Sequence, residues 1–267
     1  MAIPKQNNIL EGMVAVVTGA ANGNGRAITL RLIADGASVF ASDIDGQALQ
    51  NLMVEVVQTG GSIKTGIFDS AKVSDAEGLL DEAVSHYGRR DILVNNAGPI
   101  RAEPFPNVSE ETWDWSTSIN MKGLYFSMQR AAIHMMKQHS GTIINIASIA
   151  GIAGGITLSP PYAASKSAVI NLTKVAASKL AEFGVTVNAV APGIVNTAFN
   201  WQLDEQIGVG EMGLKPGEFL QDRSTGIPLG RISVPEDVSN VVAFLSGPDA
   251  SYITGETIVV SGGMVMR

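Results

Sequence analysis

Residues 16–25 carry an apolar run directly into a loop with three glycines, and they read Val16-Val17-Thr18-Gly19-Ala20-Ala21-Asn22-Gly23-Asn24-Gly25. The pattern predicts a strand over residues 13–18 and a helix over about 24–35. Gly19 can then turn the chain sharply off the strand, while Gly23 and Gly25 let the backbone approach a ligand closely. The start of the helix would direct N–H groups and the positive end of its dipole at an anion such as a pyrophosphate.

This loop matches neither of the two best-known phosphate-binding patterns. Arg26 follows the last glycine at a spacing foreign to a P-loop, and Gly-x-Gly-x-x-Gly is absent. By itself the loop is equally compatible with a glycine-rich turn that binds nothing. Asp43 favours a nucleotide, because it closes the next predicted strand about 20 residues further on, where a carboxylate accepts hydrogen bonds from an adenosine ribose. A carboxylate also repels a 2′-phosphate and no Arg or Lys lies beside it, so NAD is predicted rather than NADP.

Short β-branched runs alternate with helix-length segments along the whole chain. This alternation predicts an α/β fold, with one doubly wound parallel sheet of about seven strands and helices on both faces. No linker or repeat divides the chain, so residues 1–267 are expected to form one domain. Residues 194–228 have no clear period and are interpreted as a substrate loop or lid. The predicted strands are 13–18, 37–42, 63–68, 91–95, 142–147, 185–190 and 257–260, and the predicted helices are 24–35, 46–59, 73–88, 109–138, 160–183 and 235–246.

Composition narrows the class of protein. The 267 residues are 45% hydrophobic, enough for a sizeable core, and the formal net charge of −7 argues against nucleic-acid or anionic-membrane partners. The chain has no cysteine, and its three histidines (His86, His134 and His139) do not form a zinc-binding pattern, so no metal site is predicted. Without a signal-peptide pattern or a membrane-spanning run, we expect a cytoplasmic protein.

Tyr162 and Lys166 form the main candidate for chemistry. They are four residues apart, which places them one turn apart on one face of the predicted helix. An ammonium beside the phenol would lower the tyrosine pKa, so that Tyr162 could exchange a proton with a substrate alcohol or carbonyl. Ser148 follows a predicted strand, where parallel sheets place ligands, and its hydroxyl could polarise the same oxygen. Taken alone, each of these residues is equally compatible with an ordinary structural role.

Taken together and in order, the motifs resemble those of the short-chain dehydrogenase/reductase family. After the glycine loop these motifs are Asn95-Asn96-Ala97-Gly98, Asn120, Ser148, Tyr162-Ala163-Ala164-Ser165-Lys166, Pro192-Gly193 and the final segment Asp249–Gly263. The resemblance covers essentially the whole chain and implies a Rossmann-like fold. It implies that Tyr162 is the acid/base, Ser148 orients the substrate, Lys166 also binds the nicotinamide ribose, and Asn120 supports a proton relay through water.

The resemblance also implies where the cofactor lies. Asp69 is expected against the adenine, Asn96 beside the ribose, and Val195 with Thr197 at the nicotinamide carboxamide. The family commonly has an aliphatic residue at the position of Asn24, so this amide is a departure. The full set of predicted cofactor-binding residues is Gly19, Asn22, Gly23, Asn24, Gly25, Asp43, Ile44, Asp69, Ser70, Asn96, Ala97, Gly98, Tyr162, Lys166, Pro192, Gly193, Val195 and Thr197.

The substrate is less defined. Specificity is expected in residues 194–228, with Phe199, Trp201 and Leu203 as apolar lid contacts, and in residues 99–105 and 151–159. No basic cluster is ready to bind an acyl-carrier protein or a phosphorylated sugar. The lid is loosely similar to those of short-chain polyol, acetoin and small secondary-alcohol dehydrogenases. The leading interpretation is therefore an NAD-dependent secondary-alcohol dehydrogenase.

Two alternatives remain. One is a 3-oxoacyl or other carbonyl reductase, and the other is a non-catalytic NAD(H)-sensing protein. The resemblance further implies a homo-oligomer, a tetramer rather than a dimer, built through the helices at 109–138 and 160–183.

Overall fold

The sheet of the protein is parallel throughout, as the alternating sequence pattern predicts. The computed structural model describes residues 8–103, 105–154 and 159–266. Within them, seven strands pair in the order β3-β2-β1-β4-β5-β6-β7. The strand order reverses between β1 and β4, which are direct neighbours, and such a reversal opens a crevice at the carboxyl ends of the strands. The strands are β1 (Val14–Thr18), β2 (Ser38–Asp43), β3 (Ile63–Ile67), β4 (Ile92–Asn95), β5 (Gly141–Ile146), β6 (Val185–Pro192) and β7 (Thr257–Val260).

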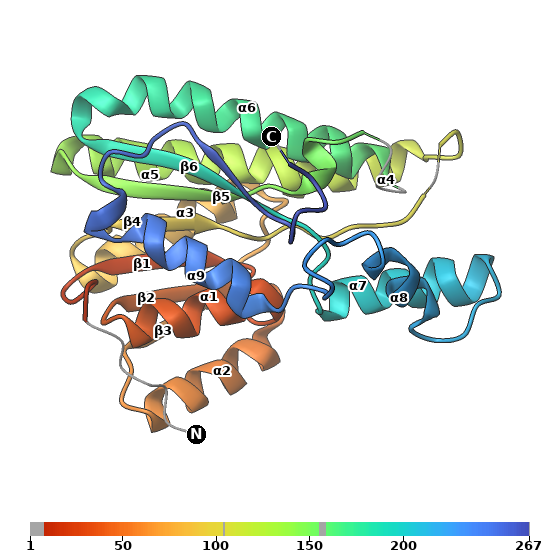
Figure 1. The fold of residues 1–267 in the computed structure, drawn as a ribbon. Helices are drawn as coiled ribbons and strands as arrows, with labels where there is room; N and C mark the ends of the chain where they lie inside the picture. Colours follow the sequence, from red (N-terminus) through yellow and green to blue (C-terminus); the bar gives the residue numbers. More distant parts are fainter. Residues whose placement is uncertain (1–7, 104, 155–158, 267) are drawn as a thin grey trace.

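Helices cover both faces of the sheet, which confirms the predicted doubly wound fold (Figure 1). One layer consists of α1 (Gly23–Ala34), α2 (Gly46–Gln58) and α9 (Pro235–Ser246). The other layer consists of α3 (Val73–Tyr87), α5 (Leu124–Gln138) and α6 (Pro160–Leu180).

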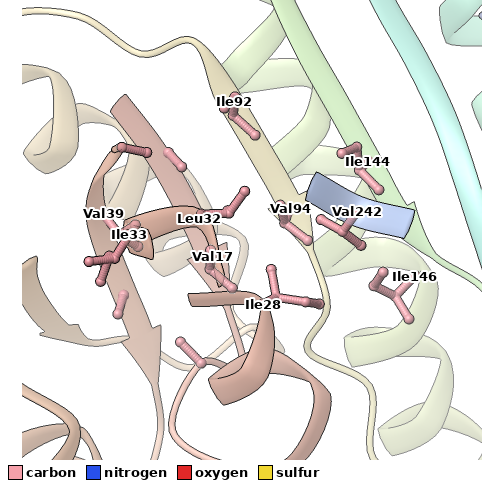
Figure 2. Packing of buried hydrophobic residues seen from close by; sticks show 14 of the residues in the cluster. Val17, Ile28, Leu32, Ile33, Val39, Ile92, Val94, Ile144, Ile146 and Val242 are labelled. Atoms are coloured by element: carbon pink, nitrogen blue, oxygen red, sulfur yellow. The ribbon is translucent and has the colours of Figure 1, made fainter. Parts of the chain in front are cut away.

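Successive strand residues serve the two layers in turn. Val17 packs with Ile28 and Leu32 of α1 on one face, as Figure 2 shows, while its neighbour Val16 packs with Leu79 of α3 on the other. All of these side chains are almost completely buried. A strand covered on both faces has no polar side to present, which explains why the strands read as continuous apolar runs.

The helix predicted over 109–138 is interrupted. The chain forms α4 (Glu110–Thr117), a π-helical turn over Ser118–Gly123, and then α5. The side-chain amide of Asn120 donates to the carbonyl of Ser116 four residues earlier, a carbonyl that a regular α-helix would use for its own backbone. π-helical turns of this kind often occur at functional sites. The helix predicted over 160–183 likewise ends at Leu180, and a 3₁₀ turn spans Ala181–Phe183.

The segment 194–228, interpreted from its lack of period as a substrate loop or lid, contains regular structure that the sequence pattern did not indicate. It holds α7 (Ala198–Leu203), a π-helical stretch over Asp204–Glu211, and α8 (Glu218–Ser224). The buried carboxylate of Asp204 accepts hydrogen bonds from the backbone N–H groups of Gly217 and Leu220, at the start of α8. One long-range acidic cap thus fixes a short helix that has no periodic pattern of its own. In Figure 1, α7 and α8 lie together beyond one end of the sheet.

Gly25 explains why the first loop needs glycine at its end. A Cβ on Gly25 would lie 1.9 Å from the carbonyl oxygen of Gly19, so the first turn of α1 sits directly on the end of β1. Gly19 itself has a φ of +62°, which side chains other than glycine rarely adopt.

Gly25→Ala is expected to lower the free energy of unfolding by about 2 kcal/mol or more, because the backbone of the loop must shift to admit a methyl group. Gly78→Ala is the matched control, since Gly78 also lies inside a helix and a Cβ there meets nothing closer than 4.0 Å. That control should stabilise the protein by roughly 0.5–1 kcal/mol. Urea unfolding of both variants measures the difference, and equal midpoints would contradict the close contact.

Candidate active site

A cavity of about 590 Å³ lies where the carboxyl ends of the strands meet α7 and α8. Every predicted cofactor-binding residue lines it except Gly25, which is buried beneath the loop. Of the predicted catalytic residues, Ser148, Tyr162 and Lys166 line the cavity, and Asn120 lies just behind its wall. The tertiary structure therefore brings together residues that are spread over nearly 180 positions of sequence, from Gly19 to Thr197.

The glycine loop is clamped to the end of β4. The Thr18 hydroxyl accepts hydrogen bonds from the backbone N–H groups of Asn96 (3.0 Å) and Ala97 (3.1 Å). The Asn96 side-chain amide donates to the carbonyls of Thr18 (3.0 Å) and Gly19 (2.9 Å). Asn96 was predicted to lie beside the ribose, and it does line the cavity, but its N–H donors already serve the loop. Its side chain thus holds the glycine loop in one conformation.

Asn24 has a polar atom without a partner. Its side-chain oxygen is buried and accepts no hydrogen bond within the described residues, while the residue lines the cavity. A pyrophosphate offers only acceptor oxygens, so this oxygen cannot bind it directly. The amide nitrogen or a bridging water has to make such a contact. Together with the cradle formed by Gly19 and Gly25, this unsatisfied amide fits a phosphate-bearing ligand.

The Asp43 carboxylate is held at the end of β2 by backbone donors. One oxygen accepts from the N–H of Ala21 (2.9 Å) and the other from the N–H of Asp45 (3.1 Å). Each oxygen keeps a further acceptor site, so the carboxylate can receive the two hydroxyl groups of a ribose. The adjoining side chain is Ile44, which is 70% exposed and apolar. Asp43 thus presents negative charge to the cavity without a neighbouring cation in the sequence.

Tyr162 and Ser148 lie together in the cavity wall, close enough for the Ser148 side chain to act on the tyrosine pKa. The Ser148 hydroxyl accepts a hydrogen bond from the N–H of Ala150 (3.1 Å). The short 3₁₀ turn that begins after Ser148 packs tightly on α6, because a Cβ on Gly151 would lie 2.5 Å from the backbone of Lys166. Gly151 therefore belongs to a tight loop beside Ser148 and Lys166.

Burial sets the charge states of the pair. Desolvation raises the pKa of Tyr162 to about 12, and the polar side chain of Ser148 only partly offsets this effect. Burial lowers the pKa of Lys166 to about 8. We expected Lys166 to lower the pKa of Tyr162, and for the protein without bound ligands this expectation is wrong. The physical reason is that the Lys166 ammonium donates to the Ile146 carbonyl (2.8 Å) and lies 5.5 Å from the centre of the Tyr162 ring, away from direct contact with the hydroxyl.

Asn120 and Lys166 converge behind Gly98. The Asn120 amide nitrogen donates to the carbonyls of Pro99 and Ser116 (both 3.0 Å), which leaves its buried oxygen with no partner in the described part of the chain. A Cβ on Gly98 would lie 2.8 Å from both that oxygen and the Lys166 ammonium. A buried water needs both a hydrogen-bond acceptor and a donor. The Asn120 oxygen and the Lys166 ammonium, both close to Gly98, can serve as these two partners.

The lid contributes residues that the sequence identified only in part. The Phe199 ring lies 6.0 Å from that of Tyr162, and Leu203 also lines the cavity. Trp201, expected to join them, is 49% exposed, and its indole N–H donates to Asn196, so it packs the lid against itself. Lining residues that no motif indicated include Phe68, Ile119, Ile149, Ala150 and Met264, and among those inside the predicted lid are Gln202 and Arg223.

The described residues offer neither a metal-binding cluster nor a membrane-spanning helix. No three His, Asp or Glu side chains there are grouped to hold a metal ion. None of the helices in the described ranges is both long and apolar enough to cross a membrane.

Comparison with known proteins places these features in a family. A family model described as short chain dehydrogenase matches residues 13–208. The chain is 38% identical to 3-oxoacyl-[acyl-carrier-protein] reductase FabG of Thermotoga maritima, over 96% of this chain and 99% of the relative. It is 37% identical to Diacetyl reductase [(S)-acetoin forming] of Staphylococcus epidermidis, over 95% and 98% of the two chains.

A solved structure agrees with the sequence comparisons. The crystal structure of levodione reductase superposes with a TM-score of 0.90 at 28% identity, covering 95% of this chain and 98% of that one. The matched family model, the similar sequences and the similar solved structure together show that the chain belongs to the short-chain dehydrogenase family of oxidoreductases.

Proposed function

We propose that this protein transfers a hydride between NAD(H) and a ketone or secondary alcohol, with Tyr162 as the acid/base. One observation carries the proposal: the buried Tyr162 side chain lies beside Ser148 at the wall of a cavity that continues to the glycine loop and Asp43. An NAD-sensing protein without activity would have no need of this arrangement. The nicotinamide, when bound, supplies or accepts the hydride.

The residues that would hold the cofactor follow from the site. The N–H groups at the start of α1 suit the pyrophosphate, and Asp43 suits the adenosine ribose. Asp69 and Ser70 line the cavity near the end of β3, the region assigned to the adenine. Val195 and Thr197 line it beyond β6, the region assigned to the carboxamide.

The charge states suit carbonyl reduction at neutral pH. With its pKa raised to about 12, Tyr162 is protonated and can donate to a carbonyl oxygen that Ser148 also contacts. The Lys166 ammonium then stabilises the phenolate that remains. A water between Lys166 and the Asn120 oxygen can return a proton to this pair. In the reverse direction the same groups accept the proton of an alcohol.

Two substrate classes fit this chemistry. A small polyol, diol or other secondary alcohol suits the apolar lid residues Phe199 and Leu203. A 3-oxoacyl or similar carbonyl compound is the alternative, favoured by the protonated state of Tyr162 and by the carbonyl reductases among the relatives.

We also infer a cytoplasmic homo-tetramer, in which the region 194–228 acts as the lid of one domain. The exposed apolar side chains of Tyr125 and Ile133 on α5 and Val175 on α6 offer the faces for assembly.

Tyr162→Phe is expected to lower kcat by roughly 10²–10⁴-fold, because it removes the transferred proton and keeps the ring. NADH binding, followed by its fluorescence, should persist. Tyr252→Phe, at a fully exposed tyrosine, is the control and should behave as wild type. Activity is measured with NADH and a panel of ketones, and with NAD and a panel of alcohols. Full turnover by Tyr162→Phe would contradict the assigned role.

Asp43→Asn should reduce the preference for NADH over NADPH by roughly 10- to 100-fold, because the charge that repels the 2′-phosphate is lost. The quantity compared is the ratio of kcat/KM for the two cofactors. Asp249→Asn removes one exposed charge elsewhere and should leave the ratio unchanged. A wild-type enzyme that prefers NADPH would refute the assignment of NAD.

Lys166→Met tests the buried ammonium through stability. Below about pH 8 Lys166 is charged in both the folded and unfolded states, so the folded protein bears the full burial penalty. Between about pH 8 and the ordinary value of 10.5, the folded state releases this proton while the unfolded state keeps it. The free energy of unfolding of wild type should therefore rise relative to Lys166→Met as pH rises, by roughly 3 kcal/mol in total.

Urea unfolding between pH 7 and pH 10 measures this difference. The raised pKa of Tyr162 acts only above pH 10 and is present in both proteins. Lys174→Met, at an exposed lysine of the same helix, should differ from wild type by a constant amount at every pH. If the difference in free energy of unfolding between wild type and Lys166→Met did not change with pH either, the Lys166 ammonium would be well solvated.

A further inference from the structure

Arg223 is a cation of the cavity wall that has no oxygen partner among the described residues. It lies on α8, in the lid, and its side chain lines the same cavity as Tyr162 and Ser148. No hydrogen bond or ion pair of its guanidinium occurs within the described residues, where its contact is the ring of Phe219, 5.4 Å away. The other described arginines all have oxygen partners, namely Arg26, Arg31, Arg89, Arg90, Arg101, Arg130 and Arg231.

A guanidinium that has lost part of its water is destabilising unless an acceptor restores its hydrogen bonds. Burial lowers the pKa of Arg223, although a guanidinium keeps its charge at any ordinary pH. The face of Phe219 offsets part of the lost hydration. The N–H donors of the guanidinium have no protein acceptor within the described residues, and a half-buried charge of this kind gains from a counter-ion.

The position of Arg223 is fixed by the helix that carries it. The Asp204 carboxylate caps the start of α8 through the N–H groups of Gly217 and Leu220. Leu220, one turn before Arg223, is buried against Ile194 and Met264, which themselves line the cavity. Arg223 is therefore attached to the end of the cavity beyond β6, rather than to the end where Asp43 and Asp69 lie.

The remaining charges of the cavity favour an anion at Arg223. The cationic residues among its lining are Lys166 and Arg223, and the Lys166 ammonium is already bound to the Ile146 carbonyl beneath Tyr162. One unpaired guanidinium matches the single charge and the two oxygens of a carboxylate. The acidic lining residues, Asp43 and Asp69, belong to the opposite end and cannot serve as its partner.

We propose that Arg223 binds a carboxylate of the substrate, so that the enzyme acts on an oxo acid and the corresponding hydroxy acid. The inference rests on the proposed function and narrows its substrate class. The carboxylate sits under the lid and the carbonyl at Tyr162 and Ser148, so Arg223 selects the substrate and orients it for proton transfer.

Paired substrates test the proposal. Wild type is assayed with NADH and with 3-oxobutanoate, 4-oxopentanoate and 5-oxohexanoate, each beside its neutral amide, because the series varies the distance from carbonyl to charge. At least one acid should be used about 10- to 100-fold better than its amide, as judged by kcat/KM. Arg223→Gln should bring that ratio close to one, and Arg223→Lys should retain part of the preference. Lys215→Gln removes an exposed charge from the same lid and should leave the ratio unchanged.

A binding measurement separates this proposal from the proposed function. Calorimetry with the Tyr162→Phe protein and NADH reports acid and amide binding without turnover, and adding Arg223→Gln should remove the preference for the acid. Turnover of ketones without preference for any acid would overturn the role of Arg223 and leave the oxidoreductase intact. Weaker NADH binding by Arg223→Gln, with acid and amide equally affected, would also overturn it and assign the guanidinium to the cofactor phosphates. If neither turnover nor acid-selective binding occurred, both proposals would fail.

Discussion

The contact between the first turn of α1 and the end of β1 is the constraint on which the rest of the site depends. There is no room for a side chain at Gly25, because the Gly19 carbonyl occupies that space. Thr18 and Asn96 then join the loop to the end of β4 through four hydrogen bonds. Since β1 and β4 are the strands between which the sheet reverses its order, this clamp holds open the crevice in which a dinucleotide can lie.

A buried polar network extends that rigidity toward Tyr162 and Lys166. Asn95 donates to Asn145 across the sheet (2.9 Å), and Asn145 donates to Thr173 of α6 (3.0 Å). Ser127 of α5 donates to Asn95 (2.8 Å). Fully satisfied networks of this kind specify one arrangement, since a shift would leave buried polar groups unpaired. The two strands and two helices around Tyr162 are thereby held in one geometry.

Three polar groups in or beside the cavity lack partners in the described chain, namely the oxygens of Asn24 and Asn120 and the guanidinium of Arg223. Polar groups that lose water are normally paired, so these three point to what the cavity receives. The first suits a nucleotide phosphate through water or its amide nitrogen, the second a buried water, and the third a carboxylate.

The strands were predictable because their signal is local. Each is an apolar run bounded by turn residues, and observed ends differ from the predicted ones by at most two residues. The glycine loop, Asp43 and the Tyr162–Lys166 pair were equally accessible, since their residue types and spacing reflect geometry within one loop or one helical turn. The π-helical turn at Asn120 and the helices of the lid were not, because hydrogen bonds that tie the Asn120 amide to Pro99, and α8 to Asp204, decide them.

The sequence by itself determined the sheet, its two helical layers, the family resemblance and most of the residues that line the cavity. Only the tertiary structure decided the charge states of Tyr162 and Lys166, because burial outweighs proximity and raises the pKa of Tyr162 rather than lowering it. It also decided that Trp201 packs the lid while Arg223 enters the cavity. Such properties depend on which groups lose their water when distant segments pack together, and no local pattern of residues encodes that.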